Sequence, residues 1–405
     1  MERNLLISID KLQRLSQLAT LFFKLGSTGF GGLAVQIAMM EYEVVGKRQW
    51  LTHEIFLDFV GASNLVPGPN AVEIALQIGY VQAGWLGFAV SGISFILPSS
   101  LITIGLASVY KEFGTLPQLA YFWEGIKPAI LAVILIAIWK LGKTVVKNWR
   151  LAVIGISVLI ASILGVNEMI TVFLGGIIGM FWLRFDSRLK PPSNEQRISG
   201  SENPTFWIPQ TVVMLGITLA VVLLIDIGVP KSISIWKLSL FFLKVGTLLY
   251  GGGYVLIAFL QGELVNNLGW LTQQQLFDAI AIGQITPGPL LSTATFIGYL
   301  LLGVPGAVMA TISIFLPSFL FGALLHSVIP QLRRFKWTSA FLDAINVSSI
   351  ALMAAVVIKL SQSALTSWQT CLVALGVCII GFRWKVNVSL LIVGGAIVGW
   401  ILLSF

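Results

Sequence analysis

Charged residues are scarce in this chain of 405 residues, since Asp, Glu, Lys and Arg together make up 10% of it. Soluble domains carry about 25% charged residues, so an ordinary soluble protein is excluded. Hydrophobic residues account for 57%, and the mean hydropathy is +0.91. At about 20 apolar residues per spanning helix, the length has room for about ten to thirteen membrane crossings and none for a separate catalytic domain. We therefore predict an all-α polytopic membrane protein.

Cysteine and histidine are also scarce, with two residues of each. Cys371 and Cys378 share one apolar segment, and His53 and His326 lie far from them in the sequence. This excludes a recognisable thiol metal site or redox pair, and the sequence has no flavin or haem motif. We expect no metal, no cofactor and no enzyme activity. The net charge of +8 is interpreted as basic cytoplasmic loops against anionic lipid, and not as nucleic-acid binding.

One long polar stretch interrupts the apolar sequence. Residues 186–203 contain both charge signs, two prolines and several serines, and they cannot be buried in lipid. We predict an N-terminal repeat at residues 1–185 and a polar cytoplasmic linker at residues 186–206. A C-terminal repeat follows at residues 207–405, led by one extra helix at residues 207–224.

The two parts of the chain are copies of each other. Shifting residues 22–70 by 220 positions onto residues 242–290 gives 17 identities in 49 positions without a gap. Two helices that share only composition would not align lysine, Trp-Leu-Thr and Pro-Gly-Pro together, so we infer a duplication. Farther along, Leu-Pro-Ser at residues 97–99 matches residues 316–318 after the loss of one residue of offset.

The apolar runs predict the same series of spanning segments in each copy. In the first copy they are residues 14–43, 54–80, 85–110, 119–139, 151–164 and 169–183. In the second they are residues 238–260, 273–299, 304–326, 339–360, 368–380 and 386–402. For the segments that start at residues 54 and 273, re-entry from one side of the membrane is the alternative to a full crossing.

Equivalent loops carry unequal positive charge. The loop after residue 139 holds Lys140, Lys143, Lys147 and Arg150, whereas its counterpart near residues 361–366 has no basic residue apart from Lys359 at the helix end. The next pair reverses, because residues 165–168 lack Lys and Arg while residues 381–385 include Arg383 and Lys385. Cytoplasmic loops are enriched in Lys and Arg, so the copies face opposite sides of the membrane. This predicts an inverted repeat, the architecture of many transporters.

The Pro-Gly-Pro motifs lie inside two of the predicted spans. Proline lacks a backbone donor and glycine favours non-helical dihedrals, so a helix must break there. A half-helix that starts at Pro69 or Asn70 would point its free N–H groups into a polar cavity, where an anion fits. A simple proline kink is the alternative, but duplication and a preceding amide, Asn64 or Gln284, favour a binding site.

Glycine-rich stretches and lysines precede these motifs. Gly31-Gly32 and Gly251-Gly252 predict a second helix break in each copy, with close helix packing as the alternative. Lys24 and Lys244 lie inside apolar runs, where a charge is costly and usually faces a cavity. Each could provide positive potential for an anion, or its side chain could snorkel to the membrane surface.

Several carboxylates are candidates for proton coupling, because a buried carboxylate is the usual proton carrier in a membrane. For Glu43 and Glu263 an interfacial ion pair is the alternative, and Asp58 and Asp278 could equally be charges at the start of a helix. The full set of candidates is Glu73, Glu43, Glu263, Asp58 and Asp278.

The duplicated pattern of F-x-K-x-G, Phe-Gly-Gly, Trp-Leu-Thr and N/Q-x-x-Pro-Gly-Pro resembles the chromate ion transporter family in its long, fused form. Tyr250 replaces the phenylalanine in the second copy. The resemblance implies a multi-pass inner-membrane exporter of the chromate oxyanion, driven by the proton motive force and conferring chromate resistance. Sulfate or another tetrahedral oxyanion, a small-anion channel and a non-transporting scaffold remain alternatives, and a homodimer is left open.

Together these lines predict one oxyanion site near the membrane midplane, between the copies. Backbone N–H groups and amide side chains would bind the anion, and the two lysines would balance its charge. The predicted binding residues are Lys24, Gly31, Gly32, Asn64, Pro67, Gly68, Pro69, Asn70, Lys244, Gly251, Gly252, Gln284, Thr286, Pro287, Gly288 and Pro289.

Overall fold

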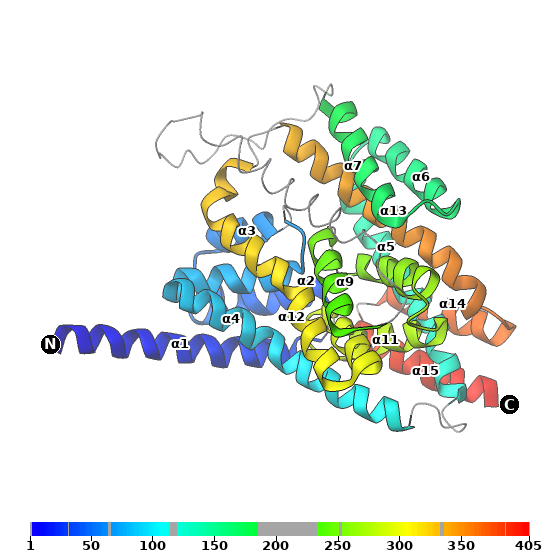
Figure 1. Cartoon of the computed structure of the whole chain (residues 1–405), viewed down its shortest axis with the longest axis horizontal. Helices are drawn as coiled ribbons and strands as arrows, with labels where there is room; N and C mark the ends of the chain where they lie inside the picture. Colours follow the sequence, from blue (N-terminus) through cyan, green and yellow to red (C-terminus); the bar gives the residue numbers. More distant parts are fainter. Residues whose placement is uncertain are drawn as a thin grey trace.

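The computed structural model describes residues 2–30, 32–63, 66–113, 120–184, 233–250, 253–332, 336–384 and 386–404. These residues form helices and connecting loops and include no strand, which confirms the all-α fold (Figure 1). The predicted linker at residues 186–206 and the predicted extra helix at residues 207–224 lie outside the described residues.

The helices follow the same order in both copies. The first copy consists of α1 (Glu2–Thr28), α2 (Leu33–Glu41), the π-helix η1 (Tyr42–Lys47), α3 (His53–Ser63), α4 (Asn70–Phe113), α5 (Ala120–Val145), α6 (Trp149–Ile163) and α7 (Glu168–Arg184). The second consists of α9 (Ile235–Leu248), α10 (Val255–Phe259), the π-helix η4 (Leu260–Asn267), α11 (Gln273–Ile285), the 3-10 turn η5 (Leu290–Ser292), α12 (Thr293–Leu332), α13 (Lys336–Ala364), α14 (Trp368–Arg383) and α15 (Val388–Ser404).

The first predicted span, residues 14–43, is a broken helix that folds back on itself. Helix α1 ends at Thr28 and α2 starts at Leu33, with Gly32 at a φ of 84° between them. Lys24 Nζ lies 2.8 Å from Glu43 Oε1. A straight helix would separate these residues by about 28 Å along its axis, so α2 and η1 return alongside α1.

The segment that carries Pro-Gly-Pro also enters and returns. Helix α3 ends at Ser63, and α4 begins at Asn70, directly after the motif. At the other end of the first stretch of α4, Gln82 Nε2 donates to the Trp50 carbonyl, 3.2 Å away, beside the start of α3. Residues 54–80 are therefore a re-entrant hairpin and not a span, which decides between the two alternatives for this segment.

Helix α4 turns sharply after this hairpin. At 44 residues a straight helix would be about 66 Å long, twice the hydrocarbon thickness of about 30 Å. Ala83 and Gly84 leave the helical region, with Gly84 at a φ of 64°. Gly79 then packs against the Gly87 carbonyl, an approach that no larger residue would permit. The second copy repeats this turn at Leu302 and Gly303.

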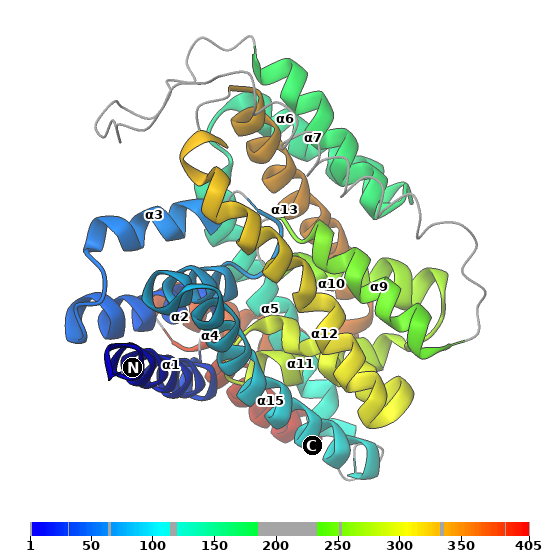
Figure 2. The ribbon, with the colours of Figure 1, turned by 60° about the vertical axis from the view of Figure 1, so that its left-hand side comes forward.

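The copies are interlocked through their long helices. Helix α5 of the first copy packs against α14 and α15 of the second, and α13 of the second packs against α6 and α7 of the first. Helices α4 and α12 cross between the copies, while α1 covers α4 and α9 covers α12 (Figures 1 and 2). Among the described helices, α4, α5, α12 and α13 are long and apolar enough to span a bilayer.

The basic loops of the two copies meet on one face. Trp139 in the last two turns of α5 and Phe382 at the end of α14 stack edge to face, with ring centroids 6.3 Å apart. Lys140 and Lys143 follow the first aromatic residue, and Arg383 follows the second. Non-equivalent loops of the two copies thus share a side of the membrane, as an inverted repeat requires. The structure confirms this part of the predicted fold.

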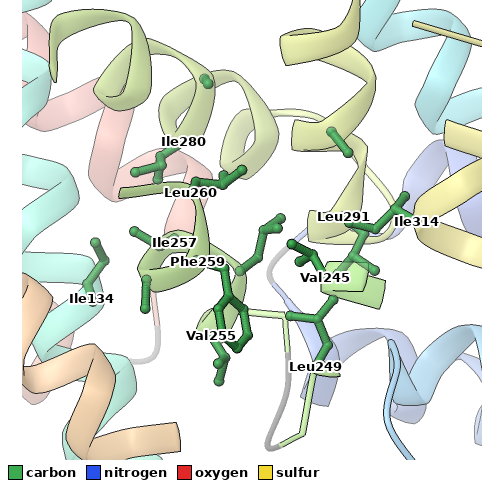
Figure 3. Close-up of a cluster of buried hydrophobic side chains, with 14 of the residues drawn as sticks. Ile134, Val245, Leu249, Val255, Ile257, Phe259, Leu260, Ile280, Leu291 and Ile314 are labelled. Carbon is green, nitrogen blue, oxygen red and sulfur yellow. The ribbon is translucent and has the colours of Figure 1, made fainter. Parts of the chain in front are cut away.

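The helix that follows the glycine break is buried to different extents in the two copies. Helix α10 is enclosed, with Val255, Ile257 and Ala258 at 0%, 3% and 0% exposure. Figure 3 shows the first two of these side chains in an apolar cluster with Ile134 of α5. The equivalent helix α2 is only partly buried. One side of the bundle is therefore closed around α10, and the other is open around α2.

Candidate functional site

A cavity of about 380 Å³ lies where the two copies meet. Both Pro-Gly-Pro loops and both breaks contribute to its lining, with Pro69 and Gly32 from the first copy and Gly288 and Gly253 from the second. Helices α5 and α15 form the opposite wall with apolar residues that include Val133 and Leu391. Residues that are more than 200 positions apart in the sequence thus line the same cavity.

Two helix starts face this cavity. Asn70 and Ala71 open α4, and Leu290 and Leu291 open η5, which continues into α12; all four residues line the cavity. The Pro69 carbonyl accepts from Val72 N–H, and the Pro289 carbonyl accepts from Ser292 N–H. N–H groups in the first turn have no partner within their own helix. The cavity therefore has the donors and the positive dipole ends that bind anions.

One amide side chain adds a free donor. Gln284 lines the cavity at 9% exposure, and its Nε2 atom has no hydrogen-bond partner among the described residues. Its side chain lies against the Tyr254 phenol, which also lines the cavity. The neighbouring Thr286 hydroxyl donates to the Ile282 carbonyl at 2.7 Å. A buried donor without a partner is costly, and an anion oxygen would satisfy it.

Each Pro-Gly-Pro loop is hydrogen-bonded to the break of the other copy. Gly68 N–H donates to the Leu249 carbonyl at 2.9 Å, and Gly288 N–H donates to the Gly29 carbonyl at 3.2 Å. Gln36 Nε2 strengthens the second junction with a bond of 2.6 Å to the Gly288 carbonyl. Gln36 was not predicted as a site residue, because Leu256 occupies the equivalent position and no polar pattern marks it.

The central residue of each motif must be glycine. Gly68 has a φ of 141° and Gly288 a φ of 97°, in the region that side chains disfavour. A Cβ on Gly68 would lie 2.5 Å from both Glu73 Oε1 and Ser318 Oγ, and one on Gly288 would lie 2.8 Å from Ser99 Cβ. The serine of each Leu-Pro-Ser motif thus packs on the central glycine of the opposite copy's Pro-Gly-Pro motif.

The structure places the predicted lysines away from the cavity lining. Lys24 pairs with Glu43 at 2.8 Å, and its side chain is 56% exposed. Lys244 is buried at 5% exposure in α9 and does not line the cavity. The lysine that does line it is Lys140, near the end of α5. From sequence it counted only as one of several loop charges.

The carboxylates occupy different environments, and none lines the cavity. Glu73 is fully buried one turn behind Asn70, and neither oxygen has a hydrogen-bond partner among the described residues. Asp278 is also buried but accepts from the Tyr110 hydroxyl at 2.6 Å and from Gln274 Nε2 at 2.9 Å.

The other three carboxylates are less suited to carrying a proton. Asp58, the repeat counterpart of Asp278, is exposed. Glu43 is paired with Lys24, and Glu263 accepts from Asn267 Nδ2 at 3.3 Å. The duplication therefore does not extend to the surroundings of these acids.

The remaining predicted residues divide into two groups. Pro67 and Pro287 are buried within their loops and do not line the cavity. Four lie outside the described residues, namely Gly31, Asn64, Gly251 and Gly252. Within the described ranges, no group of three His, Cys, Asp or Glu side chains could hold a metal ion.

Gln36→Leu is expected to lower the free energy of unfolding by about 1–3 kcal/mol, because it leaves the buried Gly288 carbonyl without its side-chain donor. Thermal unfolding of the purified protein in detergent measures the loss. Gln17→Leu, at an exposed position of α1, is the control for adding a leucine. Equal unfolding temperatures for the two variants would show that this hydrogen bond contributes little to stability.

Comparison with known proteins gives consistent matches over nearly the whole chain. The profile described as "Chromate transporter" matches residues 16–180 and residues 236–400. A "Probable chromate transport protein" of Synechococcus elongatus is 30% identical over 404 residues, covering 98% of each chain. A "Chromate transport protein" of Cupriavidus metallidurans is 31% identical, covering 95% of this chain and 92% of its own, and one of Pseudomonas aeruginosa is 28% identical with the same coverage. No solved structure matches.

Proposed function

Because this chain belongs to the chromate transporter family and is a multi-pass membrane transporter of an oxyanion, we propose that it exports chromate across the inner membrane. Export of chromate would make the cell resistant to it. The observation that carries this proposal is the cavity at the junction of the copies. Two helix starts and the unpartnered Gln284 amide face it. These are neutral donors, which can bind a dianion and still release it.

Export fits the side on which the cavity opens. Its lining reaches the surface at Lys140 near the end of α5 and at Val386 before α15, and both residues are exposed. The positive-inside rule assigns this face, with its basic loops, to the cytoplasm. Chromate from the cytoplasm would enter here, and the polar linker at residues 186–206 would lie on the same side.

Release on the other side follows from the inverted repeat. The enclosed α10 and the partly exposed α2 are equivalent elements in different surroundings. In the outward-open state α2 would take the enclosed arrangement and α10 the open one, while both Pro-Gly-Pro loops stay at the site. The buried α10 closes the far side in this state, which favours a transporter over a continuous channel.

The proton motive force would drive this cycle. Its electrical part alone favours export, because moving two negative charges out of an inside-negative cell releases about 4.6 kcal/mol per 100 mV. A pH gradient would act through a buried carboxylate, and Glu73 is the foremost candidate because it lies one turn behind the helix start that faces the anion. Asp278 is the second candidate.

Labelled chromate uptake into inverted membrane vesicles tests the proposal, since export becomes uptake in that orientation. We expect saturable uptake that responds both to membrane potential and to an imposed pH gradient. Labelled sulfate in parallel shows whether the site also accepts another tetrahedral dianion. Flux that follows the potential without saturating would instead identify a channel, and vesicles with no flux of either anion would contradict the proposed function.

A further inference from the structure

Lys140 stands at the entrance of the cavity without an acidic partner. It is exposed, it lines the cavity, and no ion pair to a carboxylate is found for it among the described residues. The neighbouring lysines at the end of α5 and directly after it are engaged elsewhere. Lys143 Nζ lies 4.6 Å from the centroid of the Trp139 ring, and Lys147 pairs with Asp343 at 2.8 Å. Lys140 is thus available to an incoming anion.

The second copy has a lysine at the equivalent place. Helices α5 and α13 end at matching positions, Val145 and Ala364, and the Lys-Leu pair at residues 140–141 aligns with residues 359–360. Because the copies are inverted, Lys359 lies at the opposite side of the membrane. It occupies the corresponding position at the entrance that is closed in this structure.

The surroundings of Lys359 are different, because an acidic residue faces it. Glu168, the first residue of α7, lies within electrostatic range of Lys359 and of Glu263. Its carboxylate also packs against Gly262 of η4, where any Cβ would collide with it. Glu168 therefore lowers the positive potential at the lysine and packs against the π-helix η4.

The second copy has no counterpart of this carboxylate. Asn167 precedes Glu168 and accepts from Thr171 N–H, and the equivalent Asn387 precedes Val388 and accepts from Leu391 N–H. Val388 thus occupies the place of Glu168, and it lines the open cavity. The open entrance combines a lysine with an apolar residue, and the closed entrance combines a lysine with a carboxylate.

Resting on the proposed function, we propose that Lys140 is the residue that captures the oxyanion at the cytoplasmic entrance, and that Glu168 cancels this attraction at the opposite entrance. A dianion approaching Lys140 meets net positive charge, whereas one approaching Lys359 also meets a carboxylate that repels it. The carrier therefore binds its substrate more tightly from the basic-loop side. This asymmetry biases a pseudo-symmetric protein toward loading in the cytoplasm.

Lys140→Gln is expected to raise the chromate concentration at half-maximal uptake into inverted vesicles about tenfold, while the maximal rate changes less than twofold. Lys143→Gln removes a positive charge from the same helix without touching the cavity, and it should behave like the unchanged protein. Lys140→Arg should restore the low chromate concentration at half-maximal uptake. High salt should shrink the difference, because screening weakens attraction at an exposed entrance.

Binding without transport gives the second measurement. Equilibrium dialysis of labelled chromate against the purified full chain in detergent should show about tenfold weaker binding by Lys140→Gln than by Lys143→Gln. Equal binding by both variants would overturn the role of Lys140 and leave the proposed function standing. Absence of chromate binding by the unchanged protein would instead count against the proposed function.

Discussion

Gly68→Ala is expected to reduce chromate uptake into inverted vesicles at least a hundredfold, with protein abundance in the membrane near normal. The new methyl group would lie 2.5 Å from Glu73 Oε1 and Ser318 Oγ, and alanine disfavours the φ of 141° at this position. The loop must shift, and the start of α4 shifts with it. Because backbone N–H groups hold the anion in the proposed site, a displaced helix start removes the site while the bundle remains.

Two further glycines make this test specific. Gly288→Ala should have the same effect. The added Cβ would collide with Ser99 of the other copy, and alanine disfavours the φ of 97° at this position. Gly84→Ala is the control, because its φ of 64° is also unfavourable but nothing lies within 4 Å of the added Cβ. Uptake that persists in Gly68→Ala and Gly288→Ala would contradict an anion site built from these helix starts.

Glu73→Gln is expected to abolish the response of uptake to an imposed pH gradient and to lower concentrative uptake about tenfold. Glutamine has nearly the same shape as a protonated glutamate but cannot release a proton. The side chain is fully buried with no hydrogen-bond partner among the described residues, so the substitution breaks no bond seen in the structure. Chromate binding in equilibrium dialysis should be retained, because Glu73 does not line the cavity.

The control for this substitution lies on the same helix. Glu112→Gln changes an exposed carboxylate near the end of α4 and should leave the pH response unchanged. If Glu73→Gln keeps a normal pH response, Glu73 is removed from the proton path. Asp278, which is buried and bonded to Tyr110, would then be the next residue to replace.

The broken helices could be predicted from the sequence because their cause is local. Proline and glycine interrupt backbone hydrogen bonding wherever they stand, and the duplication showed which interruptions mattered. The same local signals could not show that residues 54–80 re-enter. That outcome depends on contacts such as Gln82 with Trp50, which form only when the chain has folded back.

The surroundings of charged side chains were harder to predict than the course of the backbone. Lys24 was predicted to face an anion or to snorkel, but its partner Glu43 lies 19 residues later and reaches it only because α2 folds back along α1. Asp58 and Asp278 are equivalent in sequence, yet one is exposed and the other is buried. Their environments are set by neighbours from other helices, and the two copies recruit different neighbours.

The exchanged hydrogen bonds at Gly68 and Gly288 also bear on how such a protein could have arisen. Each copy supplies a loop that hydrogen-bonds to the interrupted helix of the opposite copy, and α5 and α13 each pack against the last two helices of the other copy. An ancestor with one copy would have had half of each junction. A single copy would therefore complete its junctions only beside a second molecule inserted in the membrane in the opposite sense, and the duplication supplies that second copy within one chain.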